Sequence, residues 1–130
     1  MNKPRILLLL SLVTSVYTTY LYAHAEHDKA RYVAENGEDI GHCDKPETPC
    51  LSIGYASKKA NKGDKILVSQ GQYQVKSVDE LFYLTSELVP SYGGYSQADH
   101  YKKAQPKQYV TYLSGVPAQY VALLNERGFT

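Results

Sequence analysis

The side chains that could carry acid–base or nucleophilic chemistry are scattered along the chain. Asp79 and Glu80 are adjacent, but neighbours on a strand point to opposite faces and would not form a paired-carboxylate site. No Gly-x-Ser-x-Gly nucleophile motif occurs, and Gly93-Gly94 lacks the spacing of a phosphate-binding loop. We therefore predict no catalytic residue, no metal and no cofactor, and we interpret these polar side chains as solvated: Asp39, Asp44, Asp64, Asp79, Glu80, Asp99, His27, His42 and His100.

Two cysteines, Cys43 and Cys50, offer redox or metal chemistry. The six residues between them include Pro46 and Pro49, so a bond between the thiols would pin a short polar loop. A metal pair with His42 is the alternative, but the spacing lacks the second ligand pair of a zinc site. We favour a disulfide, stabilising the fold by about 2–3 kcal/mol if the loss of unfolded-chain entropy is the main term.

Tyrosine is the residue in excess, with 13 copies against two Phe and no Trp. Tyrosine joins a flat apolar ring to a polar tip, which suits wet interfaces and stacking on sugar rings. Packing of the same rings into the core is the alternative, and the sequence leaves both open. The candidate binding surface consists of Tyr92, Tyr95, Tyr101, Tyr109 and Tyr112.

The first 25 residues have the three parts of a secretory signal peptide. Lys3 and Arg5 precede an apolar run over residues 6–13, and Ala23-His24-Ala25 precedes Glu26 as a cleavage site. An uncleaved N-terminal anchor is the alternative, although the apolar run is shorter than the ~20 residues that span a bilayer. We expect cleavage between Ala25 and Glu26, with residues 26–130 working outside the cytoplasm in the periplasm, on the outer surface or after release. No transmembrane segment is expected after cleavage.

The charge balance excludes an electrostatic nucleic-acid partner. The whole chain has 14 Lys and Arg against 13 Asp and Glu, so loss of Lys3 and Arg5 leaves a net charge near −1. Nucleic acid and anionic lipid both select a basic surface, which this balance does not provide.

The elements that must position these residues are short and punctuated by glycine and proline. Ser52 is predicted to cap a helix over residues 53–60, and Pro117 to start a second helix over residues 118–127. Residues 38–49 are expected as loop, residues 92–95 as a tight glycine-rich turn and residues 96–107 as a polar loop. Strands are predicted over residues 31–34, 65–69, 73–75, 80–85, 88–89 and 109–114, with another beginning at 129. This is a mainly β pattern with one or two helices.

The order of these elements resembles the start of secreted bacterial right-handed parallel β-helix proteins of the pectin-lyase-like kind. The similarity is carried by residues 31–39 and 49–56, then by Gly63-Asp64-x-Ile66-x-Val68 and Gly71-x-Tyr73. Gly93-Gly94-Tyr95 and Thr111-x-Leu113-x-Gly115 are similar to elements of the next coils. The arrangement also resembles the N-terminal region of surface proteins called choice-of-anchor B, although no propeller repeat occurs here.

The resemblance implies that residues 26–130 form an N-terminal cap plus the first coils of a longer β-helix, which continues into further coils or a C-terminal domain. Lyases of this fold place their catalytic groups on later coils, so no catalytic position can be transferred to this sequence. We expect a non-catalytic structural domain with a polysaccharide or cell-surface partner. The alternatives are the N-terminal part of a polysaccharide lyase or glycoside hydrolase whose active site lies beyond Thr130, and a free-standing secreted binding module.

Overall fold

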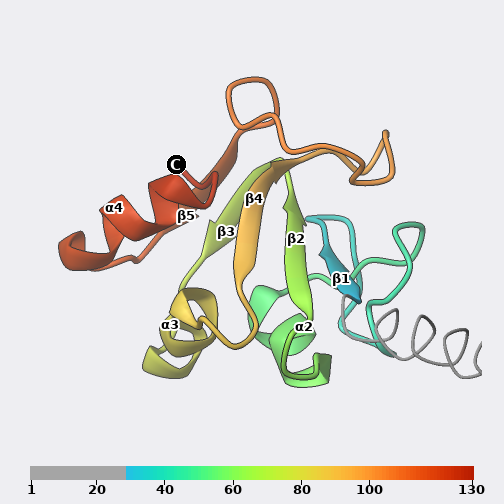
Figure 1. Ribbon diagram of the computed structural model, residues 1–130, viewed down its shortest axis with the longest axis horizontal. Coiled ribbons are helices and arrows are strands. Elements are labelled where there is room, and N and C mark those ends of the chain that lie inside the picture. Colours follow the sequence, from blue (N-terminus) through green and yellow to red (C-terminus); the bar gives the residue numbers. More distant parts are fainter. Residues whose placement is uncertain (1–28) are drawn as a thin grey trace, which may run out of the picture.

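A computed structural model describes residues 29–130, which form a mixed α/β structure (Figure 1). The predicted signal peptide and its Ala25–Glu26 cleavage site lie outside these residues. Within the described part, no helix is long and apolar enough to span a membrane. The elements in chain order are β1 (Ala30–Val33), α2 (Ile53–Lys59), β2 (Lys65–Ser69), β3 (Gly71–Gln74), α3 (Val78–Thr85), β4 (Ser91–Tyr95), β5 (Thr111–Ser114) and α4 (Ala118–Glu126).

The strands form two small sheets, and every strand pair in them is parallel. One sheet has the order β1-β2-β4, with Tyr32 beside Leu67 and Leu67 beside Tyr92. The other pairs β3 with β5, with Gln72 beside Tyr112. β2 leads directly into β3 through Gly71, whose φ of +144° suits glycine. Helices supply the longer connections that parallel pairing requires.

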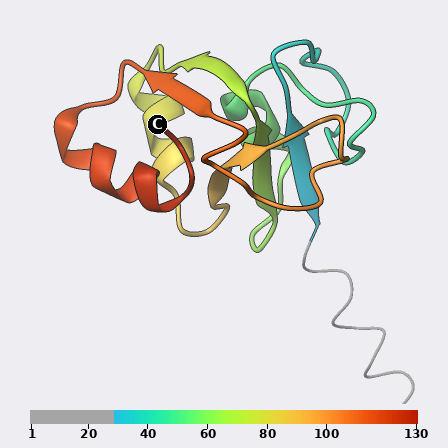
Figure 2. The ribbon, with the colours of Figure 1, turned by 90° about the horizontal axis from the view of Figure 1, so that it is seen from above.

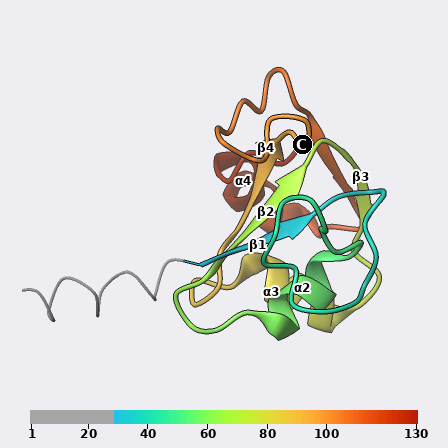
Figure 3. The ribbon, with the colours of Figure 1, turned by 90° about the vertical axis from the view of Figure 1, so that its right-hand side faces the viewer.

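The core lies between the three-stranded sheet and the helices. Val33, Ile66 and Val68 are buried on one face of this sheet. Ala56 of α2, Leu84 of α3 and Leu124 of α4 belong to the same cluster, as does Phe129. Figures 1 and 3 show α2 and α3 side by side at the ends of the strands, where they contact each other. Tyr73, Val75 and Leu113 of the two-stranded sheet region also pack against this cluster, so the helices and the second sheet together cover the inner face.

Several predicted elements are confirmed. Ser52 caps α2, where its hydroxyl accepts a hydrogen bond from the Tyr55 N–H at 3.2 Å. Strand β2 has the predicted bounds, and the strands and helix expected at 31–34, 73–75, 109–114 and 118–127 are present with ends shifted by at most two residues. Phe129 forms a parallel bridge with Thr111, consistent with the strand beginning expected there.

The strand predicted over residues 80–85 is wrong, because these residues belong to α3. The hydroxyl of Ser77 accepts from the Glu80 N–H at 3.2 Å, and the Glu80 carboxylate accepts from the Lys76 N–H at 2.5 Å. This reciprocal pattern resembles a capping box and starts a helix rather than a strand. Residues 29–130 consequently contain three helices instead of one or two.

The turn predicted over residues 92–95 is also wrong, because these residues form β4. Gly93 packs so closely that a side-chain carbon there would lie 2.7 Å from the Gly128 carbonyl oxygen. Gly94 has a φ of +83° and lies against Pro106. The glycines therefore permit a bulged strand in a crowded place. The strand expected at residues 88–89 does not form, and the Leu88 carbonyl accepts from the Gly63 N–H instead.

Candidate functional site

A bulge in β4 places Tyr92 and Tyr95 on the same face of the three-stranded sheet. Residues three apart on a regular strand point to opposite faces. Here Tyr92 pairs with Leu67 and Tyr95 pairs with Ser69, and these partners are two residues apart on β2. The register shift at Gly93-Gly94 inserts the extra residue. Both phenols consequently lie on the face opposite the helices.

We call this surface the outer face and define it by Tyr32, Lys65, Leu67, Tyr92 and Tyr95. Tyr32, Leu67 and Tyr92 are neighbours across the three strands. Lys65 precedes Leu67 by two residues on β2 and so shares its face. A shallow cavity of about 350 Å³ lies here, lined by Gly63, Lys65, Pro90, Tyr92 and Tyr95.

The outer face combines apolar rings with hydrogen-bond donors. Tyrosine rings offer a flat surface for the apolar side of a sugar ring, and phenol and ammonium groups can donate to its oxygens. Burial raises the pKa of Tyr95, and the neighbouring phenol of Tyr92 adds to this effect. A phenol is already neutral at physiological pH, and the raised pKa keeps the Tyr95 hydroxyl neutral to higher pH, so it can both donate and accept a hydrogen bond.

The segment over residues 96–110 crosses part of the outer face. Figure 2 shows it leaving β4, reaching β1 and returning to β5. Tyr101 fastens it, since its hydroxyl donates to the Val33 carbonyl at 3.0 Å and its ring centroid lies 4.9 Å from that of Tyr32. Tyr101 is buried, so it packs onto the outer face beside Tyr32 and presents no binding surface of its own.

The five tyrosines predicted as one binding patch are therefore divided. Tyr92 and Tyr95 share the outer face, while Tyr101 packs between Tyr32 and Tyr95. Tyr109 is half-buried in the crossing segment. Tyr112 is exposed on β5, in the other sheet. Sequence reasoning missed Tyr32 and Lys65, although the alternation along strands β1 and β2 was a signal that could have found them.

Carboxylates near the helices serve the backbone. Asp39 accepts from the N–H groups of Leu51 and Ser52 at 2.9 and 2.8 Å and from the Ser52 hydroxyl at 2.7 Å. The prediction that Asp64 is solvated is wrong, because its side chain is buried and pairs with buried Arg31 at 2.9 Å. Asp79 and Glu80 lie in the first turn of α3, where negative charge is favourable. The positions of these carboxylates are explained by the helix ends and the ion pair that they stabilise.

The histidines predicted as surface groups give no shared site within residues 29–130. His42 is exposed, and its carbonyl accepts from Arg31. His100 is exposed beside Glu47, with Nδ1 3.2 Å from the carboxylate. His27 lies outside the described residues. No group of three His, Cys, Asp or Glu side chains in the described range is arranged to hold a metal ion.

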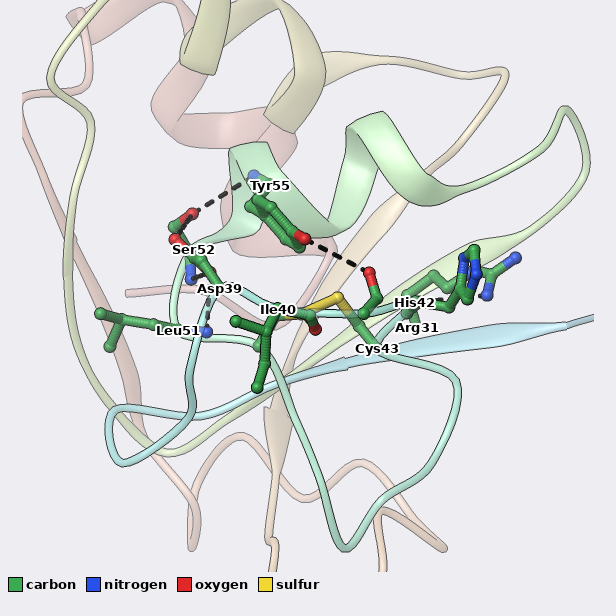
Figure 4. Close-up of a disulfide and its surroundings, with 10 residues drawn as sticks. Arg31, Asp39, Ile40, His42, Cys43, Leu51, Ser52 and Tyr55 are labelled. Carbon is green, nitrogen blue, oxygen red and sulfur yellow. Dashed lines mark hydrogen bonds between the residues drawn. A yellow bond between two sulfur atoms is a disulfide. The ribbon is translucent and has the colours of Figure 1, made fainter.

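The predicted disulfide joins Cys43 and Cys50, whose Cα atoms are 5.3 Å apart (Figure 4). The loop that it closes lies along the edge of β1 opposite β2. Tyr32 donates to the Cys43 carbonyl at 2.7 Å and accepts from the Cys50 N–H at 2.9 Å, and Ala34 donates to the Cys50 carbonyl at 3.0 Å. The disulfide-closed loop therefore satisfies the backbone groups at this edge of the sheet.

Comparison with protein-family models, curated proteins and solved structures gave no significant match.

Proposed function

We propose that residues 26–130 are a non-catalytic cap and the first coils of an exported right-handed parallel β-helix, and that the outer face binds polysaccharide. The observation that carries the proposal is that the three-stranded sheet is covered at its β1 edge and extended by parallel strands on the other side. The edge at β1 is covered by the disulfide-closed loop, while β2 and β4 stack on β1 in parallel. A solenoid needs such a cover at its first coil, because an open edge would pair with other chains.

The stacking of the helices supports a chain that builds successive coils of a solenoid. α2 follows β1, α3 follows the pair β2 and β3, and α4 follows the pair β4 and β5, with α2 in contact with α3 and α3 in contact with α4. Leu84 of α3 and Leu124 of α4 both reach the shared core. Each of these helices, with the strand or strand pair before it, contributes to the same core, as expected of successive solenoid repeats.

The outer face supports polysaccharide as the ligand class. Tyr92 and Tyr95 flank a shallow cavity with Lys65 at its rim. An open cavity with two rings suits a chain of sugars, which can lie across the surface without being enclosed. Export is supported by the predicted signal peptide and by the cysteine pair, since disulfides persist mainly outside the reducing cytoplasm.

Affinity electrophoresis of the full chain in native gels containing neutral or acidic polysaccharides tests the binding proposal. We expect at least one polysaccharide to retard the wild-type protein. A variant carrying Tyr92→Ala and Tyr95→Ala should migrate as in a polysaccharide-free gel, whereas Tyr112→Ala should remain retarded because Tyr112 lies in the other sheet. Equal retardation of the double variant, or no retardation of the wild type, would contradict the proposal.

A further inference from the structure

The two-stranded sheet has a free edge that its larger neighbour lacks. β3 pairs with β5 on one side, and no strand within residues 29–130 pairs with its other side. In the three-stranded sheet the corresponding first position is filled by β1. The chain after β1 instead enters the disulfide-closed loop and α2. The edge of β3 opposite β5 can therefore pair with one more strand.

The backbone of β3 alternates between its partner and this free edge. Gly71 donates to the Val110 carbonyl at 3.0 Å, and Val75 donates to the Ser114 carbonyl at 2.9 Å, both toward β5. In a parallel pair only alternate residues bond to a given neighbour, so Tyr73 also faces β5 while Gln72 and Gln74 face away from it. The alternation directs the N–H and C=O groups of Gln72 and Gln74 toward the free edge.

Two carboxylates bracket this edge. Glu35 accepts from the Gln72 N–H at 2.8 Å, and Glu80 accepts from the Lys76 N–H at 2.5 Å. Gln74 lies between these two positions, with its backbone groups directed between the carboxylates. Pairing with a further strand would therefore be centred on Gln74.

A groove of about 500 Å³ runs along the edge. Partly exposed Tyr73, Val75 and Leu113 contribute apolar surface to it, buried Leu84 lies beneath them, and residues 51–54 at the start of α2 form part of its wall. Its charged lining is acidic overall, because three carboxylates face one ammonium group. These charged residues are Glu35, Asp39, Glu80 and Lys76.

We propose that this groove binds an extended, lysine- or arginine-bearing peptide segment of a partner protein, which adds to β3 as a strand. Addition of a strand to a sheet edge takes its affinity from main-chain hydrogen bonds and its specificity from pockets for alternate side chains. The edge at Gln74 supplies the main-chain groups, and Val75 and Leu113 supply apolar surface for alternate side chains. The excess of carboxylates selects basic rather than acidic residues.

The test measures binding of two fluorescein-labelled octapeptides to the full chain by fluorescence anisotropy. One peptide alternates Lys and Val, and the other alternates Glu and Val. We expect the Lys–Val peptide to bind and the Glu–Val peptide not to bind. Two further Lys–Val peptides carry backbone N-methyl groups on complementary alternate residues. At least one should lose about tenfold or more in affinity, because methylation removes the amide donors that strand pairing uses.

Substitutions in the groove and on a distant helix test where the peptide binds. Glu35→Gln with Glu80→Gln should weaken binding of the Lys–Val peptide by about three- to tenfold, as loss of two partly exposed charge interactions predicts. Glu126→Gln on exposed α4 is the matched control and should bind as the wild type does. In amide-resolved NMR spectra of the wild-type chain, the peptide should shift residues 72–76 and leave residues 92–95 unchanged.

Four outcomes would overturn the proposal. Retained binding of both N-methylated peptides would show that charge alone attracts the probe. Equal binding of the Glu–Val peptide would contradict the selection by charge. Absence of shifts at residues 72–76, or of any binding by the wild type at millimolar peptide, would remove the groove as a site. The wild-type measurements stand even where a variant folds poorly.

Discussion

At the scale of single residues, two largely buried tyrosine hydroxyls make hydrogen bonds within the fold, and that of Tyr101 holds the crossing segment to β1. The Tyr101 hydroxyl donates to the Val33 carbonyl, and the hydroxyls of Ser69 and Tyr73 are 3.3 Å apart. Burial raises the pKa of Tyr73 to about 12, with a smaller opposing effect from Ser69. Burial also raises the pKa of Tyr101 above its usual range. Both phenols are therefore held neutral in the folded chain.

These phenols predict a loss of stability in alkali. In the unfolded chain they ionise near pH 10, whereas in the folded chain they keep their protons to higher pH. The unfolded state then binds fewer protons, so the free energy of unfolding should fall as pH rises from about 10 toward 12. Urea unfolding at pH 8, 10 and 11 measures this. Tyr101→Phe should reduce the pH dependence, while Tyr112→Phe, at an exposed site, should leave it unchanged.

At the scale of the elements, hydrogen bonds at the helix ends fix where α2 begins and where α3 begins and ends. Ser52 and Asp39 fix the start of α2, and Ser77 and Glu80 fix the start of α3. The end of α3 is held by Arg127, which arrives from beyond α4 and donates to the carbonyls of Leu84 and Ser86 at 3.1 and 3.2 Å. Carbonyls at a helix end lack partners within the helix, so this guanidinium joins two successive layers.

Replacement of Arg127 tests this link. Arg127→Lys should lower the free energy of unfolding by about 2–3 kcal/mol, because one ammonium group cannot serve both carbonyls and Glu87 from a buried position. Glu87→Gln should cost under about 1 kcal/mol, since the Glu87 side chain is 79% exposed. Urea denaturation measures both. A larger loss for Glu87→Gln than for Arg127→Lys would place the energy in the ion pair instead of the carbonyl contacts.

At the scale of the whole molecule, the loop that covers the edge of β1 prevents the three-stranded sheet from pairing with other chains at that edge. The disulfide-closed loop occupies the backbone groups of Tyr32 and Ala34 that would otherwise face solvent. Buried Arg31 adds a second attachment, because it donates to the His42 carbonyl at 3.1 Å while pairing with Asp64. The loop is thus held at both ends of its contact with β1.

Removal of the disulfide should expose this edge. The variant Cys43→Ser with Cys50→Ser should lose about 2–3 kcal/mol of stability and form oligomers that grow with protein concentration. Size-exclusion chromatography with light scattering measures the association. Arg127→Lys is the control, because it is expected to destabilise the fold by a similar amount without uncovering β1. Equal association of both variants would assign the effect to reduced stability alone.

Local chemistry was enough to predict much of the chain from its sequence. The Ser52 cap, the apolar run of β2 and the pairing of two cysteines depend on neighbouring residues, and each is confirmed. The helix at residues 78–85 was missed because Leu81, Phe82, Tyr83 and Leu84 form a continuous apolar run that short strands also show. The Ser77–Glu80 pattern was the local signal that would have corrected it.

Tertiary structure alone decided where the tyrosines lie. Gly93-Gly94 favours a turn by itself, and pairing with β2 makes it a strand. The resulting bulge brings Tyr92 beside Tyr95, joins them with Lys65 and leaves Tyr112 in the other sheet. The free edge of β3 likewise follows from which strands pair. Strand pairing and register depend on contacts between distant segments, whose energies are not determined by the residue types of either segment alone.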